Sequence, residues 1–113
     1  MLPLNPAQFH AVKDFFSTAT PNYPVVQAVI EQHNPGKIWV DNIEHPNRCL
    51  VISDASYSFI SGDISSETIT LLQQHKPIKL IANINQDITI FEKAGFTKIN
   101  RILFYYPEKI SKN

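Results

Sequence analysis

This 113-residue sequence contains one cysteine, Cys49, whose thiol could act as a nucleophile or a metal ligand. It also contains four histidines that could bind a metal ion: His10, His33, His45 and His75. The histidines show neither the i, i+4 spacing of two ligands on one helix face nor a spacing linked to the cysteine, so no metal site is expected. Cys49 begins the unbroken apolar run Cys49–Ile52, which predicts a buried thiol rather than a nucleophile. A lone cysteine cannot form an internal disulfide, and a cytoplasmic location is therefore expected.

Trp39 and Asp41 form the clearest polar and aromatic pair in the sequence. Alternate residues of a strand share one face, so the two side chains are expected to be neighbours. The favoured interpretation is packing within the sheet and its turn. Contact with a ligand or a partner on that face is the alternative.

The glycine content bears on another kind of chemistry, the binding of phosphate groups by backbone amides. Only 3 glycines accompany 8 prolines, whereas average usage is about 7% glycine and 5% proline. Loops that cradle phosphates need glycine where the backbone approaches the ligand closely. The scarcity of glycine therefore weighs against nucleotide and coenzyme sites.

Composition is typical of a single globular domain, with 43% hydrophobic and 18% charged residues. We expect one domain over residues 1–108 and a frayed tail over residues 109–113. The 10 basic and 10 acidic residues cancel, which argues against a nucleic-acid partner bound through a broad positive potential. No apolar stretch approaches the ~20 residues of a membrane span, so no membrane partner is expected either.

The charges are unevenly distributed along the chain. Residues 1–75 hold 3 basic and 7 acidic side chains, and residues 76–113 hold 7 basic and 3 acidic ones. The two halves therefore carry about −4 and +4. The favoured interpretation is that one domain has two faces that differ in their surface charge. The alternative is a patch that binds an anionic ligand.

The eight prolines lie between periodic segments and mark the boundaries of the elements. Asn5 and Gln8 resemble a capping box, which predicts a helix over residues 6–19. A second helix is predicted to open at residues 22–24 and to stop at residues 34–36.

The rest of the pattern predicts strands over residues 37–43, 48–53, 57–61, 78–84 and 96–106, and helices over residues 65–76 and 86–94. Short connections make the first three strands antiparallel neighbours, and the apolar run on the second predicts burial on both faces. Gly95 is expected to end the last helix in a left-handed conformation. The predicted fold class is α+β, with a mixed, mainly antiparallel five-stranded sheet flanked by four helices in the order ααβββαβαβ.

This order of elements, together with two stretches of sequence, resembles the GNAT superfamily of N-acetyltransferases. The segment Phe91–Phe96, with the sequence FEKAGF, is similar to the segment YEKLGF that ends the last helix of many GNAT enzymes. The stretch over residues 35–42, Pro46 and residues 57–63 resembles the degenerate N-terminal GNAT-like half of two-part bacterial acetyltransferases related to glycine N-acyltransferase-like proteins.

The resemblance implies a coenzyme A site where the third strand meets the next helix, since N–H groups there hold the pyrophosphate in GNAT enzymes. Gly62, Ser65 and Ser66 are the candidate cofactor-binding residues if that site is retained. Only one glycine remains, and Asp63 and Glu67 would each repel a pyrophosphate by on the order of 1 kcal/mol. A serine cap with acidic residues in the first helical turn explains the segment without a ligand. No cofactor is therefore expected, with acetyl-CoA or another acyl-CoA as the alternative.

Two further departures from the family pattern concern the end of the chain. Phe91 stands where many GNAT enzymes carry a tyrosine that protonates the departing thiolate, and a phenyl ring cannot donate that proton. It is expected to be a core residue, and Tyr105 or Tyr106 would replace that tyrosine only if the fold brought one into the cleft. A complete GNAT sheet also has two strands after the last helix, whereas residues 96–106 are predicted to form only one, with an incompletely paired edge.

The favoured hypothesis is a degenerate GNAT-like domain that is not catalytic on its own and serves as a structural, substrate-shaping or dimerisation module. Its partner would be a second copy of the chain or a catalytic GNAT domain. An active acyl-CoA-dependent N-acyltransferase is the first alternative. A homodimeric interaction protein without a small-molecule role is the second.

Overall fold

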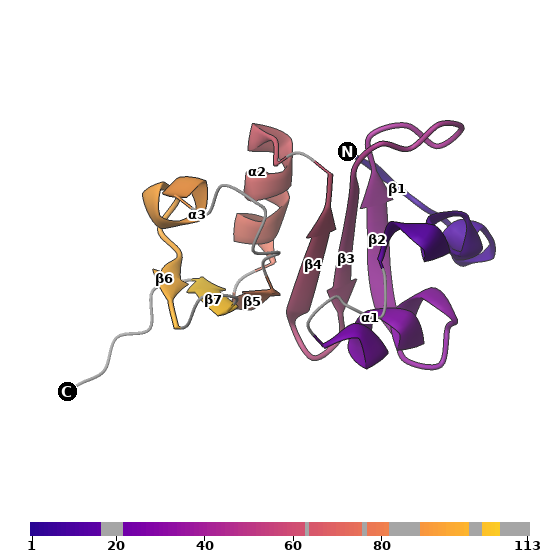
Figure 1. Ribbon diagram of the computed structural model, residues 1–113, viewed down its shortest axis with the longest axis horizontal. Helices are drawn as coiled ribbons and strands as arrows, with labels where there is room; N and C mark the ends of the chain where they lie inside the picture. Colours follow the sequence, from indigo (N-terminus) through magenta and orange to yellow (C-terminus); the bar gives the residue numbers. More distant parts are fainter. Residues whose placement is uncertain (17–21, 63, 76, 82–88, 100–102, 107–113) are drawn as a thin grey trace.

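The computed structural model of the chain describes residues 1–16, 22–62, 64–75, 77–81, 89–99 and 103–106. In chain order, the elements are β1 (Leu2–Pro3), the 3₁₀ helix η1 (Pro6–Phe15), α1 (Tyr23–Ile30), β2 (Gly36–Val40), β3 (Cys49–Ser53), β4 (Tyr57–Ser61), α2 (Ser66–Gln74), β5 (Ile78–Ile81), α3 (Thr89–Lys93), β6 (Thr97–Lys98) and β7 (Leu103–Tyr106) (Figure 1). This is the predicted α+β class. The predicted tail over residues 109–113 lies outside the described residues.

The described strands form one mixed sheet in the order β1-β2-β3-β4-β5-β7-β6, so the prediction of five strands is wrong. The strand β1, which pairs antiparallel with β2, was missed because it is only two residues long and contains a proline. The predicted strand over residues 96–106 is in fact two antiparallel strands, β6 and β7. No glycine or proline interrupts residues 97–106, and Asn100 alone is a weak turn signal.

The strands β4 and β5 are the only parallel neighbours in the described sheet, and α2 connects them. Their register pairs Tyr57 with Lys79 and Phe59 with Ile81. A parallel connection needs a crossover, and α2 supplies it. The last strand β7 then pairs antiparallel with β5, which sets Lys79 opposite Tyr105.

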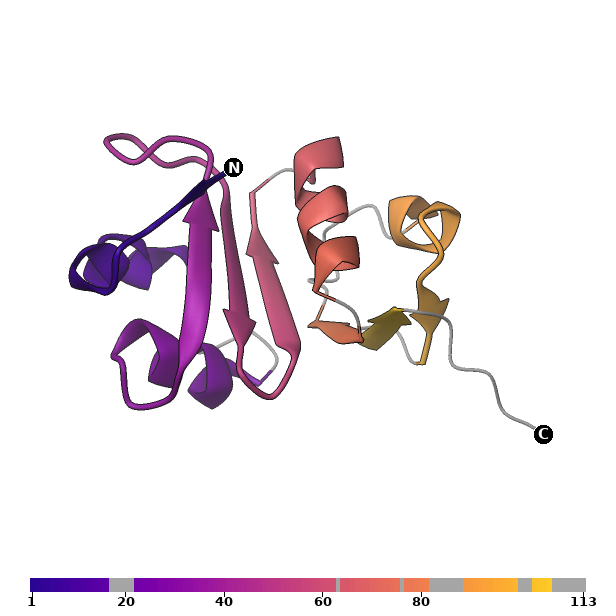
Figure 2. The same cartoon turned by 180° about the vertical axis from the view of Figure 1, so that it is seen from behind.

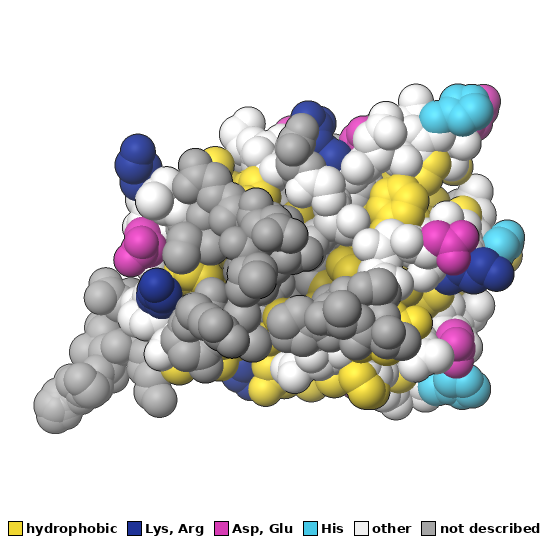
Figure 3. Space-filling model, viewed as in Figure 1, with side chains coloured by type: hydrophobic (Ala, Val, Ile, Leu, Met, Phe, Trp, Pro, Cys, Tyr) yellow, Lys and Arg dark blue, Asp and Glu magenta, His cyan; other side chains and the backbone are white. Residues whose placement is uncertain are grey.

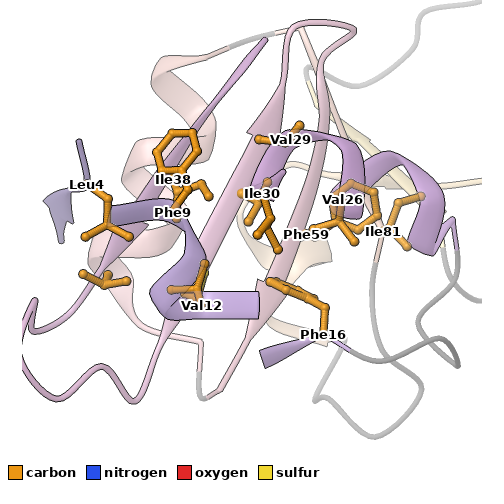
Figure 4. Close-up of a cluster of buried hydrophobic side chains, with 13 residues drawn as sticks. Leu4, Phe9, Val12, Phe16, Val26, Val29, Ile30, Ile38, Phe59 and Ile81 are labelled. Carbon is orange, nitrogen blue, oxygen red and sulfur yellow. The ribbon is translucent and has the colours of Figure 1, made fainter. Parts of the chain in front are cut away.

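The helices divide between the two faces of the sheet (Figures 1 and 2). The helices η1 and α1 pack their apolar side chains against one face of β2, β3 and β4, as Figure 4 shows for Phe9, Val12 and Val26 against Ile38 and Phe59. The helices α2 and α3 cover the other face. Its core residues are Trp39, Leu50, Ile52, Ile60, Ile69, Leu72, Ile78, Leu80, Phe91, Phe96 and Phe104. The central meander is therefore covered on both sides, and every residue of β3 is buried.

The first helix differs from the prediction, because it is a 3₁₀ helix that ends at Phe15. A 3₁₀ helix has three residues per turn, so Phe9 and Val12 fall on one face, and both are buried. The predicted capping box is present, with the Asn5 N–H donating to Gln8 Oε1 at 3.0 Å.

The second helix, α1, ends earlier than predicted because the chain turns at Gln32. This residue has a φ of +62°, and the N–H groups of Gln32 and His33 donate to the last turn of the helix at 3.0 and 2.8 Å. Left-handed helix ends are usually made by glycine, so a glutamine gave no signal in the sequence. None of the described helices is long and apolar enough to span a membrane.

Candidate functional site

The connection from β4 to α2 is the place where the resemblance puts a coenzyme, and it begins with Gly62. The φ of Gly62 is +88°, which residues with a side chain rarely adopt. A Cβ atom at this position would clash with the carbonyl oxygen of Asn47 and would lie 3.2 Å from Arg48 Cα. The packing of the end of β4 against the β2–β3 loop therefore explains the glycine without a ligand.

That β2–β3 loop is held by a carboxylate. Asp41 Oδ1 accepts hydrogen bonds from the N–H groups of Asn47 and Arg48 at 2.8 and 3.0 Å. These bonds favour the ionised form and lower the pKa of Asp41. The backbone that Gly62 meets is thus fixed by hydrogen bonds within the loop.

Ser65 and Ser66 lie where α2 begins. Ser65 is the N-cap, since its Oγ accepts a hydrogen bond from the Thr68 N–H at 3.2 Å and lies 3.1 Å from Thr68 Oγ1. Ser66 is the first helical residue and is exposed. The Ser65 hydroxyl therefore serves as the helix cap, as expected. In the described part of the chain, the N–H groups of Ser66 and Glu67 donate to no protein acceptor and remain able to meet an anion.

Glu67 places a negative charge beside those two N–H groups. Its Oε2 accepts a hydrogen bond from the amino group of Met1 at 2.8 Å. This bond lowers the pKa of Glu67, and the nearby charge of Arg48 adds to the effect, so the carboxylate is held ionised. Asp63, the second acidic residue expected at this place, lies outside the described residues.

A hollow of about 330 Å³ lies against the exposed face of α2, lined by Met1, Ser66, Glu67, Thr70, Leu71 and Gln74. Apart from the Met1 amino group, these described lining residues carry no cation. A pyrophosphate is normally bound by several convergent N–H groups or cations. The described part of this hollow offers an ionised carboxylate instead.

Phe91 is a core residue, as expected. It is fully buried, and its ring centroid lies 5.9 Å from that of Phe96 and 5.2 Å from that of Phe104. The N–H groups of Gly95 and Phe96 donate to the carbonyl groups of Glu92 and Phe91 at 3.1 and 3.0 Å, and Gly95 has a φ of +97°. The helix thus ends as predicted, with Phe91 and Phe96 in the apolar contact that accompanies this motif.

The two tyrosines proposed as substitutes for the missing proton donor lie on opposite faces of β7. Tyr106 packs against Phe96 at 5.0 Å between ring centroids, on the face covered by α2 and α3. Tyr105 lines a hollow on the other face. Neither tyrosine lies in the hollow beside the first turn of α2.

Trp39 and Asp41 have separate structural roles, as the favoured interpretation expected. The Trp39 side chain is 8% exposed and packs against the sheet and α2. Its ring makes an edge contact with His75 at 5.1 Å between centroids. The carboxylate of Asp41 accepts hydrogen bonds from N–H groups of the β2–β3 loop. The pair therefore does not form a polar site.

Cys49 is fully buried in the core, which confirms the expected role as a small hydrophobic residue. Burial raises the pKa of its thiol to about 12, so the nucleophilic thiolate is disfavoured. The described residues contain no cluster of three or more metal-ligating side chains. Figure 3 shows histidines beside acidic side chains at the upper right and lower right of the molecule, and His33 Nε2 is 3.3 Å from Glu31 Oε1.

Sequence reasoning missed one arrangement of polar side chains, in which Lys79 lies between two tyrosines. Lys79 pairs with Tyr57 on β4 and with Tyr105 on β7, and directly paired residues project from the same face. The three residues are far apart in the chain, and only the register of β4, β5 and β7 brings them together. No motif in the sequence could have indicated this contact.

Comparison of the sequence with models of known protein families, and with curated proteins, finds no match.

Proposed function

We propose that this protein is a degenerate GNAT-like domain that does not transfer acyl groups on its own. It acts as a structural, substrate-shaping or dimerisation module of an acetyltransferase-family protein. The order of the elements supports the GNAT resemblance. So do the two strands that follow α3, because a complete GNAT sheet ends in two such strands. One of the departures seen in the sequence is thereby removed.

The observation that carries the loss of activity is the packing of Gly62. In GNAT enzymes the corresponding glycines let N–H groups approach a pyrophosphate. Here the single glycine is required by the neighbouring Asn47 carbonyl group, Ser65 caps the helix, and Glu67 is held ionised beside the first N–H groups. The burial of Phe91, which has no hydroxyl group, supports the same conclusion.

The active acyl-CoA-dependent N-acyltransferase remains the second candidate, because one specific observation favours it. The N–H groups of Ser66 and Glu67 lie at the N-terminus of α2, directly after the strand that pairs parallel with β5. A helix N-terminus attracts anions. In this alternative Gly62 and Ser65 would help to shape the loop around the coenzyme phosphates.

Calorimetric titration with acetyl-CoA distinguishes the two candidates. A degenerate site predicts no binding, or binding only at millimolar concentration. Micromolar affinity, together with release of free coenzyme A when an amine acceptor is added, would overturn the proposal.

Glu67→Gln makes this titration sharper, with Glu44→Gln on the exposed β2–β3 loop as the matched control. If the coenzyme site is retained, removal of the Glu67 charge tightens binding several-fold while Glu44→Gln leaves it unchanged. If the site is lost, neither variant binds acetyl-CoA. Both variants keep a residue of the same size, and circular dichroism verifies that each is folded.

Light scattering tests the module role. The edge strand β6 has only two residues, so it offers less main chain for pairing with another copy than the longer edge expected from the sequence. A strict monomer at high concentration would exclude the homodimeric alternative and leave a second GNAT domain as the partner. A glycine-bearing GNAT segment in the same reading frame would support that partner directly.

A further inference from the structure

The described helices cover only part of one face of the second half of the sheet, the face of β5 and β7 that carries Lys79 and Tyr105. Ile81 on this face belongs to the core cluster of η1 and α1, and Leu103 packs against that cluster. The helices α2 and α3 pack on one side of β5, β7 and β6, whereas η1 and α1 lie against β2, β3 and β4 (Figures 1 and 2). The uncovered part of this face contains a hollow of about 350 Å³, whose described lining residues are Lys79, Ile99, Leu103 and Tyr105. Binding sites for small molecules begin at about 300 Å³, so this hollow is large enough for a small ligand.

Among the described residues that line this hollow, only Lys79 carries a charge. The ammonium group lies 4.7 Å from the centroid of the Tyr57 ring, and Tyr105 is the paired residue on the other side. A cation beside an aromatic face is stabilised by the electrons of the ring, so the ammonium is held at the wall of the hollow. It makes no hydrogen bond or ion pair with another described residue.

The other described lining residues are mainly apolar. Ile99 is 48% exposed, and its side chain, Leu103 and Tyr105 line the same hollow. A cation that has no ion-pair partner among the described residues, next to apolar side chains, is complementary to a ligand with one negative charge and an apolar body. A phosphate group would need more donors than one ammonium group provides.

We propose that this hollow is a binding site for a small carboxylic acid with an aromatic or aliphatic body. The carboxylate pairs with the Lys79 ammonium, and the body lies against Tyr105, Leu103 and Ile99. This site lies on the face of the sheet opposite to α2 and does not depend on the proposed function. The absence of acetyl-CoA binding would leave it unaffected.

The test is a titration of the isotope-labelled chain with 3-phenylpropionate, followed by two-dimensional NMR. We expect saturable shifts of the backbone signals of Lys79 and Tyr105. The neutral analogue 3-phenylpropanamide should bind at least about tenfold more weakly, because it lacks the charge. Acetate should give no saturable shift, because it lacks the apolar body. Higher salt should weaken the binding of 3-phenylpropionate.

Two lysine variants decide whether Lys79 is responsible. Lys79→Met keeps the apolar stem and should weaken binding of 3-phenylpropionate at least about tenfold. Lys98→Met, on the exposed edge strand β6, should leave the affinity unchanged. The dispersion of the NMR spectrum shows whether each variant is folded.

Three outcomes would overturn the proposal: no saturable shift at Lys79 or Tyr105, equal affinity for the acid and its amide, or equal weakening by the two lysine variants. If 3-phenylpropionate does not bind, and light scattering shows a dimer that Lys79→Met dissociates, the face is a contact between copies of the chain instead of a ligand site.

Discussion

The two halves of the sheet differ in how they are covered. The strands β2, β3 and β4 lie between two layers of helix, and their central residues are buried on both faces. The strands β5 and β7 are fully covered by described helices on one face only, so the half-buried Lys79 and Tyr105 alternate with the fully buried Leu80 and Phe104. On the other face, Ile81 at the end of β5 still belongs to the core of η1 and α1. An unbroken apolar run therefore marks a strand between two layers, whereas alternation of polar and apolar residues marks a strand with one face open in part.

Neighbouring residues on β7 provide the strongest test of this difference. Phe104→Ala removes a fully buried ring and should lower the free energy of unfolding by about 3–5 kcal/mol. Tyr105→Ala, on the uncovered face, should cost only about 1 kcal/mol. Urea denaturation measures both. Equal losses would mean that the second face of this half is also covered.

The glycines at the ends of β4 and α3 provide the next comparison. Gly62→Ala introduces a Cβ that clashes with the Asn47 carbonyl group, at a left-handed φ, and should cost about 2 kcal/mol or more. Gly95→Ala meets the ring of Tyr106 at 3.1 Å, and this side chain can move, so about 1 kcal/mol is expected. Thermal and urea unfolding should therefore rank Gly62→Ala as the more harmful substitution. The opposite ranking would remove the packing explanation of Gly62.

The pH dependence of stability should reveal the burial of the Cys49 thiol in the half of the sheet that is covered on both faces. Its pKa is raised from 9.0 to about 12 in the folded protein, so between these pH values only the unfolded chain loses the proton. This contribution to stability is fully present below pH 9 and falls by about 1.4 kcal/mol per pH unit as the pH rises towards 12. Cys49→Ala lacks this contribution, so its stability should decline less steeply.

A thiol reagent gives an independent measurement on the same residue. The buried thiol should react only as fast as the protein opens, and partial urea denaturation should accelerate the reaction. Rapid modification of the native protein at neutral pH would show that β3 is more accessible than its burial indicates.

Substitution of Asp41 tests the β2–β3 loop, whose backbone packs against Gly62. Asp41→Asn weakens an acceptor of two N–H groups and should cost less than about 1 kcal/mol at neutral pH, because the side chain is partly exposed. The pKa of Asp41 is lowered, so its stabilising contribution is present above its ordinary pKa of 3.8 and is lost as the pH falls further. The difference between the two proteins should therefore shrink in acid.

The smallest effect is expected for a hydroxyl group in the second half of the sheet. Thr97 Oγ1 is buried without a hydrogen-bond partner among the described residues, so Thr97→Val should change stability by less than about 0.5 kcal/mol. Ser58 Oγ donates to the Lys79 carbonyl group at 3.0 Å, and Ser58→Ala should cost about 1 kcal/mol. Equal losses in urea denaturation would indicate that the Thr97 hydroxyl is also bonded.

Much of the fold was predictable because local signals and tertiary packing agree. The apolar run at Cys49 predicted an interior strand, Gly95 predicted the end of α3, and Ser65 predicted the start of α2. The hairpin of β6 and β7 was missed because neither glycine nor proline marks its turn and Asn100 alone is a weak signal. The 3₁₀ geometry of η1 was missed because apolar residues three apart suit both helix types.

Only those contacts of the candidate site that join residues close together in the sequence could be predicted. The cap by Ser65 involves residues three positions apart and was visible in the sequence. The contact of Gly62 with Asn47 and the ion pair of Glu67 with Met1 join distant segments. Such contacts depend on the register of the whole sheet, which sequence periodicity does not specify.

The contact between Trp39 and His75 gives the molecule a built-in fluorescent reporter. Trp39 is the single tryptophan of the chain, and its partner is the residue that ends α2. Its emission will therefore follow the docking of that helix on the meander without an attached dye. Stopped-flow mixing with urea can then show whether α2 detaches before the meander itself unfolds.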